Sequence, residues 1–86
     1  MTQQEWILSS HAADRIRSRK ITVDQVRLVI ENPDRILSED SCKHIYQKKI
    51  MADQSLFLYR VFMNVCKKPK LVITAYRTSK IEKYEH

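Results

Sequence analysis

The sequence predicts one small α+β domain in which two N-terminal helices pack on a four-stranded antiparallel sheet. Its 86 residues leave room for a single hydrophobic core. Apolar residues recur at helical spacing as far as Asn32 and Pro33, and from Asp34 onward they recur at the spacing of strands. Because helices and strands are segregated along the chain, the pattern favours an α+β arrangement.

Residues 5–8 form a short apolar segment ahead of the first helix. The segment fits an edge strand, and it equally fits a lead-in that packs Trp6 against the core. The pattern alone leaves both interpretations open. An edge strand here would also offer a surface for a homo-oligomer, which the sequence does not decide.

Two helices are predicted before Asn32. The first follows an N-cap offered by Ser9 and Ser10 and covers residues 11–19. The second opens on a capping-box pattern between Thr22 and Gln25 and ends where Pro33 disfavours helical geometry in the residue before it. The inward sides are predicted to carry Ala12, Ala13, Ile16, Val23, Val26, Val29 and Ile30.

The second part of the chain has the alternation of strands. The segment 56–63 is apolar on both faces, so we expect it in the centre of the sheet, covered by the helices. The chain has no Gly, so its turns are expected to use Asp, Asn, Ser and Pro. The predicted strands are 35–37, 43–51, 56–65 and 71–78.

The composition favours an anionic partner. Sixteen Lys and Arg against ten Asp and Glu give a net charge of +6, and nucleic acid is the first candidate, although a basic surface can also serve solubility alone. The longest apolar run, residues 61–66, is far shorter than the ~20 residues of a membrane span, so no membrane partner is expected. The N-terminus lacks the features of a secretory signal, which points to the cytoplasm. Cys42 and Cys66 could pair, but free thiols are the commoner state in such a chain.

Three side chains of the first predicted helix form a stripe. His11, Arg15 and Arg19 are each four residues apart and therefore lie on one side of the helix. Like charges at this spacing repel, so an anion bound between them would relieve a cost. The alternative is a solvated helix face whose arginines pair with carboxylates of the strands. Spacing alone does not choose between the two.

The last predicted strand has one polar side. Thr74, Tyr76 and Thr78 share a face by the period of two, opposite Ile73, Ala75 and Arg77. From the pattern alone, an ordinary solvent-facing strand is the simpler interpretation. The basic residues of the C-terminal segment could reach phosphates, and they are Arg77, Lys80 and Lys83, followed by Tyr84.

No cofactor or metal is expected. A Gly-rich phosphate loop is absent because the chain has no Gly, and no nucleophile motif of a serine or cysteine hydrolase occurs. Cys42, His44 and His11 lack the paired spacing of zinc ligands.

Two motifs carry a resemblance to known proteins. The helix motif His11-Ala12-x-x-Arg15-x-x-x-Arg19 and the strand motif Thr74-x-Tyr76-Arg77-Thr78-x-Lys80 resemble a small domain-of-unknown-function family affiliated with the RelE, ParE and BrnT toxins. The resemblance implies two helices on a curved four-stranded antiparallel sheet. It covers about residues 9–80.

The resemblance also implies a function. Active members of the wider group cleave RNA without a metal, by attack of the ribose 2′-hydroxyl on the adjacent phosphate. By this resemblance His11 would act as base or acid, Arg15 and Arg19 would hold the phosphate, and Tyr76 or Lys80 would supply the remaining proton or charge. A toxin further implies two partners, a cognate antitoxin and RNA, and mRNA on the ribosome is one form that this RNA could take. ParE-like relatives act on a protein instead, so a protein-binding or a nucleic-acid-binding module is the alternative. The expected RNA contacts are Arg77, Thr78 and Lys83.

Overall fold

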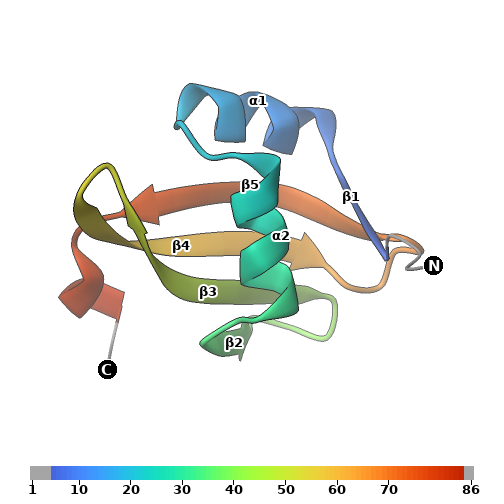
Figure 1. Ribbon diagram of the computed structural model, residues 1–86. Helices are drawn as coiled ribbons and strands as arrows, with labels where there is room; N and C mark the ends of the chain where they lie inside the picture. Colours follow the sequence, from blue (N-terminus) through green and yellow to red (C-terminus); the bar gives the residue numbers. More distant parts are fainter. Residues whose placement is uncertain (1–4, 85–86) are drawn as a thin grey trace.

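The computed structural model describes residues 5–84, which form two helices against a five-stranded sheet (Figure 1). The α+β class and the two helices are as predicted. α1 lies along β5, and α2 packs across β3 and β4. In chain order the elements are β1 (Trp6–Leu8), α1 (Ser10–Ser18), α2 (Val23–Glu31), β2 (Arg35–Ser38), β3 (Lys43–Ala52), β4 (Ser55–Asn64), β5 (Lys70–Thr78) and the 3-10 helix η1 (Ile81–Tyr84).

The sheet has one strand more than the four predicted. Its order is β1-β5-β4-β3-β2, with antiparallel pairing from β5 to β2 and parallel pairing of β1 with β5. β1 is the edge strand that the pattern of residues 5–8 left open. It also packs Trp6, which is only 6% exposed, into the core, so both interpretations of this segment describe it.

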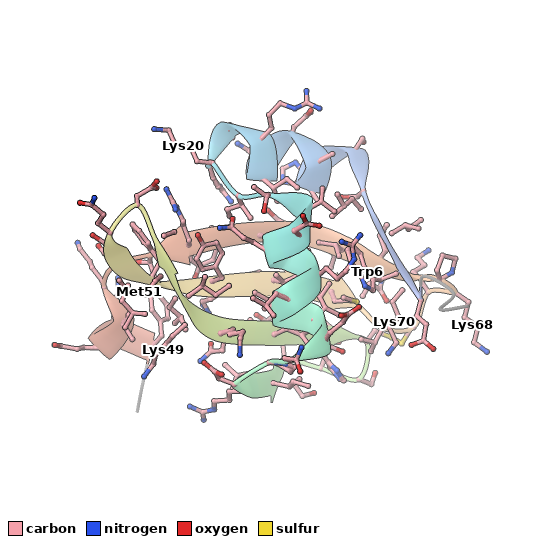
Figure 2. The ribbon with its side chains drawn as sticks, viewed as in Figure 1. Trp6, Lys20, Lys49, Met51, Lys68 and Lys70 are labelled. Carbon is pink, nitrogen blue, oxygen red and sulfur yellow. A yellow bond between two sulfur atoms is a disulfide. The ribbon has the colours of Figure 1, made fainter. Side chains whose placement is uncertain are left out.

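The helix ends follow from local side chains. The Ser9 hydroxyl accepts a hydrogen bond from the backbone N–H of Ala12, and Thr22 and Gln25 form the predicted capping box. α1 ends on a Schellman pattern, in which Lys20 takes the left-handed φ of 59° and Ile21 N donates to Ile16 O. Figure 2 shows the Lys20 side chain projecting from this corner. No helix within the described part of the chain is long and apolar enough to cross a membrane.

The tight turn between β3 and β4 also forms without glycine. Asp53 and Gln54 have φ values of 51° and 65°, as a two-residue hairpin loop with the twist of the flanking strands requires. A turn between the strands predicted at 43–51 and 56–65 was expected, but the positive φ of Gln54, like that of Lys20, was not, because only the place of these residues in the fold demands it.

The core lies between the helices and one face of the sheet. Tyr59, Val61 and Met63 of β4 face the helices, so Leu58, Arg60 and Phe62 face the other way. We call this second side the helix-free face. The side chains buried in the core include Trp6, Ala12, Ile16, Ile21, Val26, Val29, Tyr46, Tyr59, Val61, Met63, Val72 and Ala75.

The expectation of free thiols is wrong in this structure, because Cys42 and Cys66 form a disulfide. Cys42 directly precedes β3 and Cys66 follows β4 by two residues. The register pairs Lys43 with Asn64, which brings the two Cα atoms to 5.1 Å. The observation that predicts the disulfide is therefore the antiparallel register of β3 and β4. The expectation of free thiols was based on composition and compartment, and neither carries information on strand register.

Candidate functional site

The cationic stripe of α1 lies on its exposed side. Arg15 Nε donates to His11 Nε2 at 3.4 Å, and Arg19 Nη1 donates to the Ala75 carbonyl of β5 at 2.8 Å. Ser9 also donates to a β5 carbonyl, that of Ile73, through its hydroxyl. The helix is thus anchored along the edge of β5 beyond the point where β1 stops pairing. Within residues 5–84 no carboxylate forms an ion pair with any of the three stripe side chains.

The polar side of β5 faces away from the helices. β5 pairs Thr74 with Phe62, Tyr76 with Arg60 and Thr78 with Leu58, which places these residues on the helix-free face. The shared face of the two threonines and Tyr76 was predicted correctly. The helix-free face is not simply a solvent-facing surface, however, because Leu58 on this face is only 1% exposed.

Arg60 occupies the centre of an aromatic cluster on the helix-free face. Its Nη1 donates to the Tyr76 hydroxyl at 2.6 Å, and its Nε donates to Gln47 Oε1 at 3.2 Å. Its Cζ lies 4.6 Å from the ring centroid of Tyr84, 5.5 Å from that of Phe62 and 5.8 Å from that of Tyr76. We call Gln47, Arg60, Phe62, Tyr76 and Tyr84 the Arg60 cluster.

The rings of the cluster come from three elements. Phe62 on β4 and Tyr76 on β5 stack with centroids 5.9 Å apart, and Tyr84 of η1 meets Tyr76 edge-on at 6.5 Å. η1 therefore folds back over the helix-free face. Gln47 is only 4% exposed, and its amide oxygen accepts the hydrogen bond from Arg60 Nε, which holds one edge of the guanidinium in place.

Burial sets the electrostatics of the cluster. Desolvation, followed by the hydrogen-bonding interaction with Tyr84, raises the pKa of the Tyr76 hydroxyl, and the contact with Arg60 offsets part of this rise. The Tyr76 hydroxyl therefore keeps its proton beyond the pH at which an exposed tyrosine loses it, and its oxygen accepts the hydrogen bond from Arg60. No carboxylate among residues 5–84 pairs with Arg60, so its positive charge is balanced only by ring faces and neutral oxygens.

Arg77 points to the other side of the sheet and is held by the protein. Its Nη1 donates to the Tyr59 hydroxyl at 3.2 Å, its Nη2 pairs with Asp53 at 3.0 Å, and its Cζ lies 4.3 Å from the Phe57 centroid. The first of these contacts, with Tyr59, is the main cause of the raised pKa of Arg77. Its side chain is 14% exposed, so we assign it a structural role in tying the β3–β4 turn to β5.

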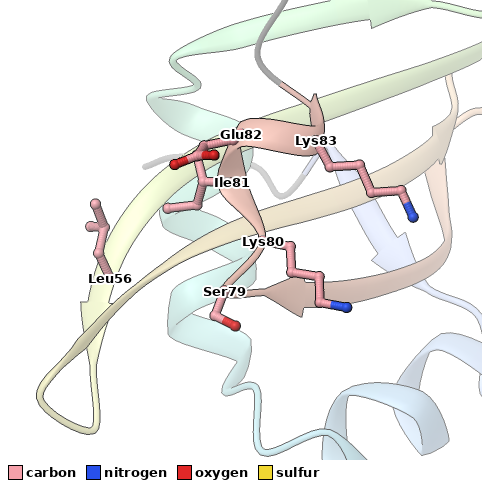
Figure 3. Close-up of a pocket in the computed structure, with 6 residues that line it drawn as sticks. All are labelled: Leu56, Ser79, Lys80, Ile81, Glu82 and Lys83. Atoms are coloured by element: carbon pink, nitrogen blue, oxygen red, sulfur yellow. The ribbon is translucent and has the colours of Figure 1, made fainter.

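The remaining predicted residues lie where β5 leads into η1. The Thr78 hydroxyl accepts from the backbone N–H of Lys80 at 3.1 Å and fixes the turn. Lys80 and Lys83 extend in the same direction, away from Leu56 (Figure 3). Both lysines are exposed.

The structure therefore does not bring all the predicted catalytic residues together. His11, Arg15 and Arg19 belong to α1 at the edge of β5, Tyr76 lies on the helix-free face, and Lys80 follows the end of β5. Sequence reasoning missed Gln47, Arg60 and Phe62. The available signal was Arg60 itself, a charge within a strand that is otherwise apolar on both faces.

The described residues contain no group of three or more His, Cys, Asp or Glu side chains that could hold a metal ion. The arrangement offers instead a guanidinium, a protonated phenol and ring faces. These groups can bind a phosphate, donate a proton and stack on a base.

The fold and this face define a small α+β domain with an aromatic and cationic sheet surface. The chain belongs to a family described as a domain of unknown function, DUF4258, which matches residues 8–77. The resemblance to a small family of unknown function is thereby confirmed. No curated protein and no solved structure matches the chain.

Proposed function

We propose that this protein is a metal-independent endoribonuclease of the RelE-like toxin group and that RNA lies on its helix-free face. The observation that carries the proposal is the Arg60 cluster. It combines an arginine without a carboxylate partner among the described residues, three ring contacts and a tyrosine hydroxyl that accepts a hydrogen bond from the guanidinium. A net charge of +6 supports an anionic ligand.

The chemistry requires a base, a charge stabiliser and an acid. The 2′-hydroxyl oxygen attacks the adjacent phosphorus and gives its proton to the base. The bond to the 5′ oxygen then breaks, and the leaving oxygen takes a proton from the acid. Arg60 stabilises the charge of the phosphorane, and Tyr76 supplies the proton. The products are a 2′,3′-cyclic phosphate and a 5′-hydroxyl.

His11 is the base in this proposal. α1 is anchored along the edge of β5, so the proposal requires the scissile phosphate to lie at this edge, with its 2′-hydroxyl toward His11 and Arg15 and its leaving oxygen toward Tyr76. Arg19 is held at the same edge by the Ala75 carbonyl. Lys80 and Lys83 contact flanking phosphates, because they are exposed and extend in the same direction from the junction of β5 and η1 (Figure 3).

A toxin of this kind works on cytoplasmic RNA and is held inactive by a cognate antitoxin, so we propose both the compartment and the partner. Reducing conditions there would open the Cys42–Cys66 disulfide. The proposal therefore requires a fold that persists with both thiols free.

The test uses the purified chain with single-stranded RNA in the presence of a chelator. We expect cleavage, cyclic phosphate ends, and no reaction at a position carrying 2′-deoxyribose. Arg60→Ala is expected to lower the rate about 10²–10³-fold. Tyr76→Phe and His11→Ala are each expected to lower it about 10²–10⁴-fold.

Arg27→Ala is the matched control, because Arg27 lies on α2 and its one ion pair among residues 5–84 is the local one with Asp24. It removes the same charge and should leave the rate unchanged. A different result would be that wild type binds RNA tightly and Arg60→Ala does not, while neither free nor ribosome-bound RNA is cleaved. That result would identify a nucleic-acid-binding module instead. Failure to bind RNA at all would leave a protein target as the function.

A further inference from the structure

A pocket lies at the junction of β5 and η1, beside the start of β4. Its volume is about 620 Å³, which is within the range of sites that hold a ligand or a side chain. Figure 3 shows the residues that line it, which are Leu56, Ser79, Lys80, Ile81, Glu82 and Lys83.

One side of the pocket is apolar. Leu56 is 43% exposed, and its cross-strand partner Met51 is 64% exposed. Ile81 lines the pocket as well, and in Figure 3 its side chain extends toward that of Leu56. Neighbouring exposed apolar side chains of this size are a feature of surfaces that bind a partner.

The other side of the pocket is cationic. Lys80 and Lys83 both line it and extend in parallel away from Leu56 (Figure 3). Neither forms an ion pair with another residue in the range 5–84. Glu82 is the one acidic lining residue, so the charge of the lining is net positive.

We propose that this pocket docks a short acidic segment of a partner protein. One large aliphatic or aromatic side chain of the segment enters between Leu56 and Ile81, and carboxylates flanking it pair with Lys80 and Lys83. RNA fits less well, because the lining holds no aromatic ring for a base and its apolar side offers nothing to phosphate.

The position of the pocket means that a docked segment would affect the proposed RNA contacts. Tyr84, at the end of η1, belongs to the Arg60 cluster, and Lys80 and Lys83 are the proposed phosphate contacts. A segment bound here occupies those lysines and so weakens RNA binding. This consequence rests on the proposed function, whereas the docking itself does not.

The test measures binding of labelled ten-residue peptides of Asp and Glu with one central Leu, Ile, Phe or Trp, each paired with the same peptide carrying central Ala. At least one peptide should bind at low salt, and its affinity should fall in 0.5 M salt. Leu56→Gln should weaken binding about tenfold or more, as expected for losing one buried apolar contact. The double variant Lys80→Ser, Lys83→Ser should weaken it several-fold.

Matched controls lie elsewhere on the molecule. Ile36→Gln removes a 50% exposed apolar side chain from β2, and Lys67→Ser removes a lysine beyond the far end of β4. Neither should change peptide binding. Circular dichroism would verify that each variant is folded.

Three results would overturn the proposal: equal binding of the central-Ala peptides, equal loss in the control variants, or no binding by any peptide. A large loss of RNA affinity in Leu56→Gln would assign the pocket to RNA. The chain could also bind the peptides with the expected effects of salt and of the variants and yet cleave no RNA. That result would support the docking site and contradict only the proposed function.

Discussion

Arg77 is a residue for which the structure shows partners that the sequence pattern does not. In the sequence it belongs to a basic segment, but its guanidinium links Asp53 in the β3–β4 turn to the hydroxyl of Tyr59 in the core. Tyr59 is only 1% exposed, so loss of this donor would leave its hydroxyl without a good partner.

We therefore predict that Arg77→Ala lowers the free energy of unfolding by about 1–3 kcal/mol. Urea unfolding followed by circular dichroism measures this change. RNA binding by the folded variant should change little. Arg35→Ala, on the exposed edge strand β2, is the control and should leave stability within about 0.5 kcal/mol. An Arg77→Ala variant as stable as wild type would remove the structural role.

Tyr76 gives a prediction on pH. Burial raises the pKa of its hydroxyl, so the folded protein holds this proton at a pH where the unfolded chain, with a pKa near 10, has lost it. The stability contributed by the neutral hydroxyl is complete below pH 10 and is lost as pH rises through the folded pKa.

Wild type should accordingly lose stability above pH 10 more steeply than Tyr76→Phe. Thermal unfolding between pH 8 and pH 11 compares the two proteins, and absorbance at 295 nm should show that the variant lacks a late-titrating tyrosine. Identical pH profiles would mean that the Tyr76 hydroxyl is not buried in the Arg60 cluster.

At the scale of elements, the turn that follows α1 contains a strained backbone conformation. Lys20 adopts a left-handed φ of 59° at a position that normally favours Gly. Lys20→Gly should raise the free energy of unfolding by roughly 0.5–1 kcal/mol, since relief of the strain outweighs the added freedom of the unfolded chain. Thermal unfolding should show a rise of a few degrees.

Arg17→Gly is the control for this substitution, because it removes the same charge at a position inside α1 with ordinary helical geometry. It should lower stability by about 1 kcal/mol. Equal effects of the two substitutions would contradict the assignment of strain to Lys20.

Elements were predictable where a feature is local in the sequence. The boundaries of β3 to β5 agree with the periodicity to within one residue, and the capping box of Thr22 fixed the start of α2. The pairing of β1 with β5 was not predictable, because 64 residues separate Trp6 from its partner Lys70 and no periodicity links them.

The candidate site was predictable only in part for the same reason. The period of two placed Tyr76 on the polar face, and helical spacing placed His11 beside Arg15. Arg60 approaches Tyr76 only through the register of β4 and β5, and Tyr84 approaches through the return of η1. The residue pattern of one strand predicts neither of these two contacts, because each joins separate elements.

At the scale of the whole molecule, the helices cover one face of the sheet and leave the other to the Arg60 cluster and η1. The core is therefore one-sided, and a chain of this size buries a modest fraction of its surface. In so small a fold, a covalent link within the chain is expected to contribute a large share of the stability.

The Cys42–Cys66 disulfide is that link, and it joins residues 24 positions apart at the ends of β3 and β4. Closing a loop of this length stabilises a fold by roughly 3 kcal/mol through the unfolded chain. The double variant Cys42→Ser, Cys66→Ser should therefore fold but unfold about 10–20 °C lower. Reductant should lower the unfolding temperature of wild type to that of the variant and leave the variant unchanged. If reductant has no effect on wild type, the bond does not form in solution; if the reduced protein is unfolded at 37 °C, a cytoplasmic ribonuclease is excluded, because the same chain could not keep its fold in that compartment.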